Sequence, residues 1–278
     1  MRILVTGAAG QLGAAIARDY AGRANVLPVT RKALDIGDAG AVETLIAREH
    51  PDVVTNCAAY TDVEGAEDHA VEAIRVNTMA VGELARAAAA AGAMFVHYSS
   101  DFVFDGLADR PYTEEDEPAP QSVYASSKLL GEWFAAGCPR HYVLRVESLF
   151  GGSPRHSSVD RIVDAIRNGE PARVFVDRTV TPSYVHDVAD ATWRLIGAGA
   201  APGVYHCVNS GVTTWFELAK EIGRQLGVEP NLVPLKVADV TMRARRPQYA
   251  ALSNAKLARA GIQMPAWQDA LRRHLATL

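Results

Sequence analysis

Short apolar runs alternate with longer segments of helical character along this chain. The runs are rich in Val, Leu and Ile, are typical of strands buried on both faces of a parallel sheet, and lie at 2–6, 25–30, 52–59 and 94–98. The segments between them are Ala-rich or amphipathic and predict helices at 14–21, 39–49 and 66–91. This alternation predicts an α/β fold with a Rossmann-type, doubly wound parallel sheet. Ligands of such sheets bind beyond the carboxyl ends of the strands.

The last third of the chain continues this pattern less regularly. A helix at 184–198 and a strand at 204–208 are expected to return to the sheet, and a further helix is expected at 214–226. We therefore predict an NAD(P)-binding Rossmann domain and a smaller α+β domain for the substrate. The first spans 1–145 with the returning segment 184–208, and the second spans 146–183 and 209–278.

Composition and charge narrow the class of protein. The 278 residues are 49% hydrophobic, enough for a full α/β core, and the net charge of -4 gives no basic bias toward nucleic acid. No apolar run reaches membrane-spanning length and Met1 leads directly into a strand, so we expect neither a membrane partner nor a signal peptide. Cys57, Cys138 and Cys207 are far apart and contain no Cys-x-x-Cys pair. They argue against a disulfide scaffold or a zinc site and favour the reducing cytoplasm.

A glycine motif follows the first strand. Gly7, Gly10 and Gly13 have the spacing G-x-x-G-x-x-G between a strand and an Ala-rich helix. In such a turn the first glycine permits the bend, the second lets a pyrophosphate approach, and the third lets the helix pack on the strand. The helix N-terminus then offers free N–H groups to the phosphates. This context predicts dinucleotide binding, the alternative being a Gly-rich turn without a ligand.

Basic residues follow the second strand, where an NAD-selective site would carry an acidic one. Arg31 suits a 2′-phosphate, so the sequence favours NADPH, the alternative being a solvated Arg31. Asp35 is a candidate for a hydrogen bond to the adenine amino group. The small residues at the end of the third strand, Ala58 and Ala59, leave room for a cofactor to lie flat.

Tyr124 and Lys128 are four residues apart in a segment that is free of Gly and Pro until Gly131. On a helix, the phenol and the ammonium would share one face. A lysine ammonium beside a tyrosine favours the phenolate and is expected to lower the tyrosine pKa. Ser100, at the carboxyl end of the preceding strand, can hold a substrate carbonyl against the same phenol. The pattern suits proton transfer to an oxygen whose carbon exchanges hydride, although Tyr-x-x-x-Lys alone also describes surface residues.

Several blocks of the chain match one family pattern, at 7–13, 34–36, 56–64, 98–106, 124–132, 205–211, 213–215 and 245–247. Through these blocks the chain resembles the dTDP-4-dehydrorhamnose reductase family of the extended short-chain dehydrogenase/reductases. The blocks Ser100–Gly106 and Thr213–Trp215 are far more specific than the glycines. The resemblance implies NADPH-dependent reduction of the C4 keto group of a nucleoside-diphosphate 4-keto-6-deoxy sugar. It points to dTDP-rhamnose biosynthesis for cell-surface polysaccharide, with NADH as a second possible cofactor.

The resemblance also implies roles for individual residues. Tyr124 would protonate the C4 oxygen, Lys128 would bind the nicotinamide ribose, and Ser100 would hydrogen-bond the keto oxygen. The residues expected to bind the cofactor are Gly7, Gly10, Gln11, Leu12, Gly13, Arg31, Asp35, Ile36, Ala58, Ala59, Tyr60, Asn77, Ser99, Tyr124 and Lys128. The residues expected to bind the substrate are Thr61, Val63, Glu64, Ser100, Asp101, Val103, Arg178, Trp215 and Arg246. The alternative for Trp215 is a buried packing residue. The alternative for the arginines at 243, 245 and 246 is a solvated charge cluster.

The chain departs from the family pattern at two places. The family usually has Arg-Thr-Ser-Trp-x-Tyr-Gly where this chain has residues 145–151, so Ser148 replaces a tryptophan that would contact the sugar. Arg178 is an added cation near the expected pocket, suited to a diphosphate or an acidic sugar. Some members of the family that the chain resembles dimerise through a magnesium ion held partly by a glutamate on the first helix. Ala14 and Ala15 occupy that region here, so we expect no metal, and a homodimer stays open.

Other functions of the same fold require residues or domains that differ from those of this chain. A dehydratase would need an acidic pair after the strand serine, whereas Asp101 is followed by Phe102. A nucleotide-sugar epimerase usually has a larger substrate domain, and a non-catalytic regulatory subunit of methionine adenosyltransferase would not need Ser100, Tyr124 and Lys128. The nucleotide, the sugar and the stereochemistry at C4 are not determined by the sequence.

Overall fold

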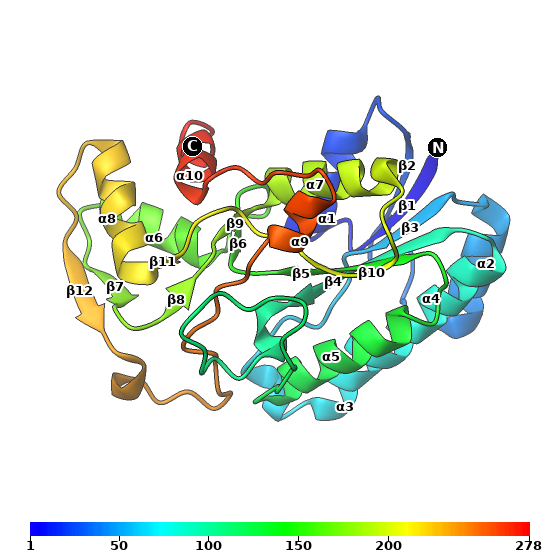
Figure 1. Cartoon of the computed structure of the whole chain (residues 1–278), viewed down its shortest axis with the longest axis horizontal. Coiled ribbons are helices and arrows are strands. Elements are labelled where there is room, and N and C mark those ends of the chain that lie inside the picture. Colours follow the sequence, from blue (N-terminus) through cyan, green and yellow to red (C-terminus); the bar gives the residue numbers. More distant parts are fainter.

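The computed structural model describes all residues from 1 to 278, and its central feature is a six-stranded parallel sheet (Figure 1). The strand order is β10-β5-β4-β3-β1-β2. The strands are β1 (Arg2–Thr6), β2 (Asn25–Val29), β3 (Val53–Asn56), β4 (Met94–Ser100), β5 (His141–Val146) and β10 (Gly203–His206). The chain runs outward from β1 to β2 and then crosses back to β3, so the winding direction reverses between β1 and β3. The expected doubly wound, Rossmann-type α/β fold is confirmed, and its ligand crevice lies at this reversal.

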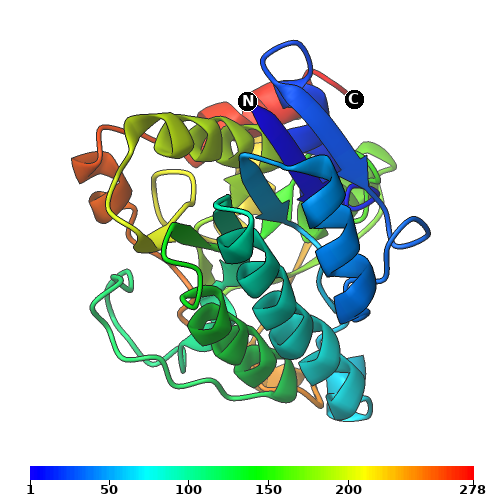
Figure 2. The ribbon, with the colours of Figure 1, turned by 90° about the vertical axis from the view of Figure 1, so that its right-hand side faces the viewer.

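Helices cover both faces of the sheet (Figure 2). One face carries α1 (Gln11–Tyr20) and α7 (Val185–Ala198), which pack on each other. The other face carries α2 (Ala39–Glu49), α4 (Ala80–Ala90) and α5 (Val123–Ala135), with α4 between the other two. Each face has its own buried core, in which Ile16 of α1 and Leu84 of α4 are fully buried representatives. Because the strands are apolar on both sides, both layers are needed to remove them from water.

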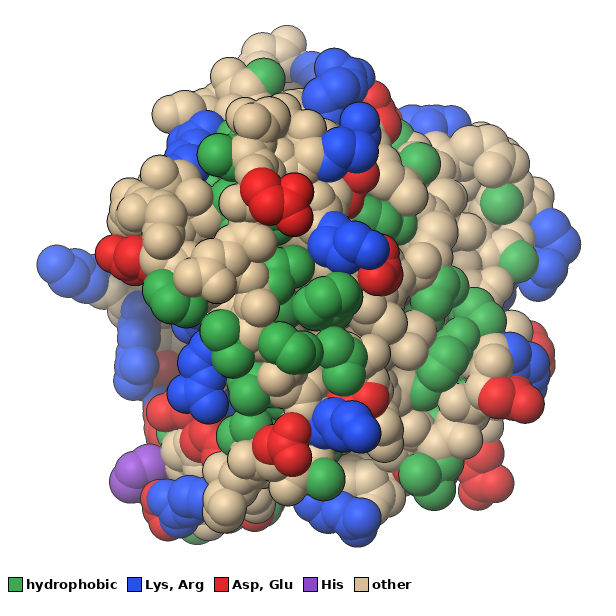
Figure 3. All heavy atoms as spheres, turned by 90° about the vertical axis from the view of Figure 1, so that its left-hand side faces the viewer, with side chains coloured by type: hydrophobic (Ala, Val, Ile, Leu, Met, Phe, Trp, Pro, Cys, Tyr) green, Lys and Arg blue, Asp and Glu red, His purple; other side chains and the backbone are tan.

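A second lobe lies beyond the carboxyl ends of the strands, on the left of Figure 1. Its main elements are α6 (Ser158–Arg167), β7 (Ala172–Phe175), α8 (Trp215–Leu226), β12 (Leu232–Leu235) and α10 (Trp267–Leu275). These enclose a separate hydrophobic core that includes Val163, Leu218 and Trp267. Figure 3 views this end of the molecule, where acidic and basic side chains are intermixed on the surface.

Short elements join the sheet to the second lobe. They are the strands β6 (Leu149–Phe150), β8 (Thr179–Val180), β9 (Ser183–Tyr184) and β11 (Thr213–Thr214), and the helix α9 (Ala255–Arg259). β6 pairs with β9 in parallel, and β8 pairs with β11 in antiparallel orientation. No helix combines the length and the apolar character that a membrane span requires.

The structure corrects the single long helix expected at 66–91. This segment consists of a short 3₁₀ turn (Gly65–Glu67), α3 (Ala70–Ile74), a π-helical turn (Arg75–Met79) and α4. The π turn inserts one extra residue per turn, which a hydrophobic pattern of helical period does not reveal. The buried Asn77 lies in this turn. Its side-chain amide accepts the backbone N–H of Tyr60 and donates to Ser127 Oγ.

Two smaller boundaries also differ from expectation. α1 begins at Gln11 rather than Ala14, because Gly10 already serves as its N-cap with extended backbone angles. β3 ends at Asn56 rather than Ala59. The Asn56 side chain accepts a hydrogen bond from the backbone N–H of Ala58 at 3.2 Å, so the chain turns away from the sheet there. The small residues of the two loops, Gly7–Gly10 and Ala58–Ala59, therefore follow the ends of β1 and β3.

Candidate active site

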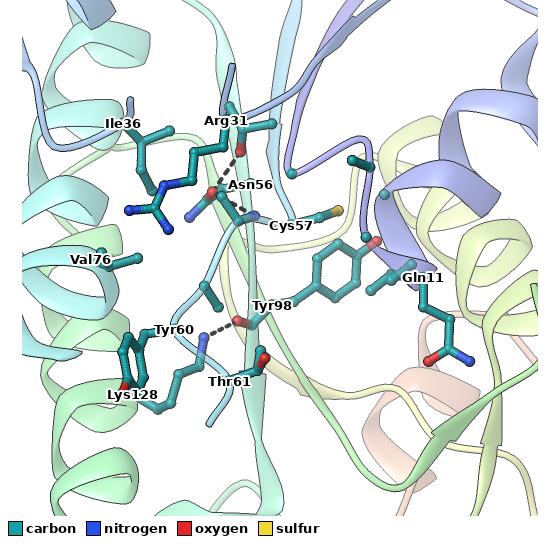
Figure 4. A pocket seen from close by; sticks show the side chains of 18 of the residues that line it. Gln11, Arg31, Ile36, Asn56, Cys57, Tyr60, Thr61, Val76, Tyr98 and Lys128 are labelled. Carbon is teal, nitrogen blue, oxygen red and sulfur yellow. Dashed lines mark hydrogen bonds between the residues drawn. The ribbon is translucent and has the colours of Figure 1, made fainter. Parts of the chain in front are cut away.

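A cavity of about 430 Å³ lies at the carboxyl ends of β1, β3 and β4 (Figure 4). In the figure, Arg31 and Ile36 lie together at one end, and Lys128, Tyr60 and Thr61 lie at the other. All the residues expected to bind the cofactor line this first cavity except Asn77. Further lining residues that the sequence did not single out are Thr6, Ala9, Val29, Leu34, Asn56, Cys57, Glu72, Arg75, Val76, Tyr98, Val146, Leu149 and His156.

The glycine turn brings backbone N–H groups to this cavity. Gly7 has a φ of 66°, a left-handed conformation that glycine adopts without strain. A Cβ on Gly13 would overlap the carbonyl oxygen of Gly7, so only glycine lets α1 approach the turn this closely. No side chain caps the first turn of α1, which leaves its N–H groups free. This cradle fits a pyrophosphate at a helix N-terminus.

The Arg31 end of the cavity carries a cluster of four charges. Arg75 donates to Glu72 in a bidentate pair, at 2.8 and 3.0 Å, and lies 3.4 Å from an Asp35 carboxylate oxygen. Arg31 lies 3.8 Å from the same Glu72, and its side chain is 83% exposed. Asp35 and Glu72 both have lowered pKa values, chiefly because Asp35 accepts the Gly37 N–H and Glu72 accepts the Arg75 guanidinium. Sequence reasoning missed Arg75, since only folding brings it from the π turn to Arg31.

The other end of the cavity carries Tyr124 and Lys128 on α5. Ser122 caps this helix by accepting the Ala125 N–H, so the helix begins just before Tyr124 and the four-residue spacing places both side chains on one face. Both are buried. The Lys128 ammonium donates to the backbone carbonyl of Tyr98 at 2.6 Å, which fixes it at the end of β4 (Figure 4).

The expectation that Lys128 lowers the Tyr124 pKa is corrected by this geometry. Burial raises the pKa of Tyr124 to about 12, with a further upward contribution from the Asp101 charge and a downward one from the Ser100 hydroxyl. Burial lowers the pKa of Lys128 to about 8. Because the ammonium is directed at the Tyr98 carbonyl, Lys128 does not offset the burial of the phenol here.

A second cavity, of about 270 Å³, adjoins the first at Tyr124. Tyr124 and Ser99 line both cavities, whereas Lys128 lines only the first and Ser100 only the second. Ser148 lines the second cavity at the position where the family pattern has tryptophan, so a smaller side chain forms this wall. The phenol therefore stands at the junction between the two spaces.

The second cavity continues into a third, of about 430 Å³, in the second lobe. Arg178, Trp215 and Arg246 line both of these cavities. Phe175 adds an aromatic ring to the third cavity. Trp215 is 8% exposed and belongs to the hydrophobic core of the second lobe. Its side chain therefore packs in this core and also lines the two cavities.

Asp101 and Arg178, which line the second cavity, interact with a third buried ionisable group, Glu147. Asp101 accepts a hydrogen bond from Ser100 Oγ at 2.8 Å, and burial raises its pKa to about 6. Glu147 accepts the backbone N–H of Thr181 at 2.5 Å and its pKa is raised, first by burial and then by the Asp101 charge. The Arg178 guanidinium favours the ionised form of both acids. Sequence reasoning missed Glu147, which directly follows β5, whereas Asp101 directly follows β4.

Several expected site residues do not line the cavity assigned to them. Asn77 is fully buried, and its amide accepts the Tyr60 N–H at 2.8 Å and donates to Ser127 at 3.0 Å, so it positions the loop instead of reaching a cofactor. Val103 is fully buried against a core that contains Phe104 and Leu129. Both were expected to contact ligands; hydrogen bonds hold Asn77 inside the protein, and apolar packing holds Val103 there.

Three further residues lie on the 60–64 loop. Glu64 pairs with Arg246 at 2.9 Å and accepts the Arg243 N–H at 2.9 Å, so it joins the loop to the second lobe instead of lining the sugar cavity. Thr61 lines the first cavity rather than the second. Val63 lines neither cavity and packs beside Tyr124.

Comparisons with known proteins identify relatives over the full chain. A family model described as "RmlD substrate binding domain" matches residues 1–278. A dTDP-4-dehydrorhamnose reductase of Mycobacterium tuberculosis is 39% identical, with 99% of this chain and 92% of that protein aligned. The crystal structure of a dTDP-4-dehydrorhamnose reductase from Clostridium acetobutylicum has a TM-score of 0.94 at 33% identity, and covers 100% of this chain and 99% of its own. That of the Bacillus anthracis reductase in complex with NADP has a TM-score of 0.95 at 30% identity, with the same coverage.

Proposed function

Because the chain belongs to the dTDP-4-dehydrorhamnose reductase family, we propose that it reduces the C4 keto group of dTDP-4-dehydrorhamnose to give dTDP-rhamnose. The observation that carries this function is the position of Tyr124, at the junction of two cavities, with Lys128 on one side and Ser100 on the other. A proton donor at that place can reach both a bound nicotinamide ring and a sugar carbonyl. The free thiols of Cys57, Cys138 and Cys207 support a reducing, cytoplasmic setting.

NADPH is the cofactor that the first cavity fits best, as in the relative solved with NADP. Its pyrophosphate would lie on the glycine turn, and its 2′-phosphate would lie near Arg31 and Arg75. The carboxylates of Asp35 and Glu72 offset these two guanidiniums, so the site also admits NADH. When bound, NADPH supplies the hydride that reduces the sugar carbon.

The chain's own groups would supply the proton and hold the carbonyl. Tyr124 gives its hydroxyl proton to the keto oxygen, and Ser100 donates a hydrogen bond to the same oxygen. Lys128, fixed at the end of β4 by its bond to the Tyr98 carbonyl, would hold the nicotinamide ribose. Burial raises the pKa of the Tyr124 phenol to about 12, so the phenol stays protonated until the substrate is in place.

The substrate would extend through the second and third cavities. The sugar occupies the space beside Tyr124 and Asp101, and the diphosphate lies between Arg178 and Arg246, whose guanidiniums match phosphate oxygens. The base reaches the third cavity, where Phe175 and Trp215 offer aromatic surface.

The function is tested by an NADPH-oxidation assay with dTDP-, GDP-, CDP- and UDP-linked 4-keto-6-deoxy sugars. We expect the highest kcat/KM with the dTDP sugar and a product reduced at C4 only. Absence of oxidation with every sugar of the panel would contradict the proposed function.

We predict that Arg75→Ala weakens NADPH by about tenfold or more while changing NADH little, because one charge-assisted phosphate contact is worth about 1.5–3 kcal/mol. Arg31→Ala is expected to act in the same direction. The ratio of kcat/KM for NADPH to that for NADH measures the effect. Arg86→Ala, on the exposed face of α4, is the matched control, since Arg86 pairs only with Glu83. An equal effect of Arg75→Ala on both cofactors would remove Arg75 from the 2′-phosphate site.

A pH dependence follows from Lys128. Its pKa is lowered to about 8 by burial, so the ammonium is present below that pH and is lost above it. We therefore expect kcat/KM to fall as the pH rises through about 8. Lys128→Met should lower the plateau and remove this basic limb. A wild-type profile that stays level through that pH would argue against a required ammonium.

A further inference from the structure

Four basic side chains line the first cavity, and three of them already have places along the cofactor. Arg31 and Arg75 lie at the end assigned to the 2′-phosphate, and Lys128 lies at the other end, assigned to the nicotinamide ribose (Figure 4). The pyrophosphate would lie between these ends, where the glycine turn offers it backbone N–H groups and no positively charged side chain. The fourth basic side chain is His156, from the segment between β6 and α6.

The segment that carries His156 is tied to the glycine turn. Gln11, in the first turn of α1, donates through Nε2 to the Gly151 carbonyl at 2.7 Å. Gly152 follows with a φ of 73°, and a Cβ at this position would lie 3.4 Å from the Gln11 carbonyl oxygen. Gln11 and His156 both line the first cavity. These contacts bring the segment to the N-terminus of α1, where the pyrophosphate is expected.

The His156 imidazole is available to an anion. Its neighbour Arg155 pairs with Asp160 at 3.3 Å and with Asp164 at 2.8 Å, and does not line the cavity. The exposed His156 side chain lies 3.1 Å, through Nδ1, from the Pro154 carbonyl oxygen. Because a carbonyl oxygen can only accept, Nδ1 carries a proton and Nε2 remains for a ligand. Nε2 then donates to a phosphate oxygen when the ring is an imidazolium.

We propose that His156 binds the pyrophosphate of the nicotinamide cofactor from the second lobe, an inference that rests on the proposed use of NADPH. The imidazolium adds a positive charge to a cradle that otherwise consists of backbone N–H groups, and hydrogen bonds with a charged partner are the stronger ones. NADPH and NADH share the pyrophosphate, so His156 serves both cofactors and does not select between them. The bound cofactor then touches both lobes of the protein.

His156→Ala should weaken NADPH and NADH alike, by about five- to tenfold each, the loss expected for one charge-assisted bond at an exposed position. Fluorescence titrations without sugar give both dissociation constants. His156→Lys keeps a cation on the segment and should bind both cofactors within about twofold of wild type. For NADPH, the double variant His156→Ala, Arg75→Ala should show the product of the two single losses, because the two residues serve different phosphates. His69→Ala is the matched control, since His69 is exposed and lines none of the three cavities.

Unchanged affinities for both cofactors in His156→Ala would overturn this contact. A loss confined to NADPH would assign His156 to the 2′-phosphate and would also overturn it. The same holds for a His156→Lys variant that binds as weakly as His156→Ala, since the charge would then not be the cause. No sugar enters these titrations, so a wild type that binds NADPH but reduces no sugar would overturn the proposed function alone.

Discussion

Tyr124→Phe is expected to lower kcat by about 10²–10⁴-fold while leaving NADPH binding unchanged, because the variant loses only the group that transfers the proton. The ring is buried against Ala66 and Ala73 and packs edge-to-face on Phe102, so phenylalanine preserves these contacts. Steady-state kinetics give kcat, and quenching of protein fluorescence on titration gives the NADPH dissociation constant.

Tyr249→Phe provides the control for Tyr124→Phe. Tyr249 is half-buried and lines none of the three cavities, so the loss of its hydroxyl should not change kcat. Wild-type turnover by Tyr124→Phe would show that another group protonates the sugar oxygen. Loss of NADPH binding together with turnover would show that the phenol serves the cofactor instead.

Glu132→Gln is expected to have the largest effect on stability, a loss of about 3–5 kcal/mol, since it leaves the Arg145 guanidinium buried without a counter-charge. Arg145 donates to Glu132 through Nε at 2.9 Å and Nη2 at 2.7 Å, and the two side chains are 4% and 3% exposed. The pair joins β5 to α5, the helix that also carries Tyr124 and Lys128. Urea unfolding of wild type and variant measures the difference.

Two further variants test whether the loss of stability comes from the buried ion pair. Glu83→Gln removes a carboxylate from an exposed pair with Arg86 and should cost at most about 1 kcal/mol. The double variant Glu132→Leu, Arg145→Met replaces the buried pair by apolar side chains and should recover much of the lost stability. A loss from Glu132→Gln no greater than that from Glu83→Gln would contradict the assigned role of the buried pair.

The parts of the site that depend on local spacing could be predicted from the sequence. The turn from Gly7 to Gly13 is set by three glycines between one strand and one helix. The face shared by Tyr124 and Lys128 is set by a four-residue step on a single helix. In both cases the functional residues are close in the sequence, so their spacing is enough to predict their relative positions.

The parts that depend on folding could not be predicted. Arg75 reaches the Arg31 end of the cavity from a π turn, and the hydrophobic period of that segment indicates only a regular helix. The pairing of Glu64 with Arg246 joins residues of opposite lobes, and each was expected to face the sugar. The upward shift of the Tyr124 pKa comes chiefly from burial, which the spacing of Tyr124 and Lys128 does not determine.

The most direct test of the central claim is a crystal structure of the protein with NADP⁺ and dTDP-rhamnose bound. The nicotinamide ring should lie in the first cavity beside Lys128, with the Tyr124 hydroxyl within about 2.6–3.2 Å of the sugar C4 oxygen. The nicotinamide C4 should lie about 3–3.5 Å from the sugar C4. A nicotinamide ring away from Tyr124, or a sugar outside the second cavity, would contradict the assignment of this phenol as the proton donor.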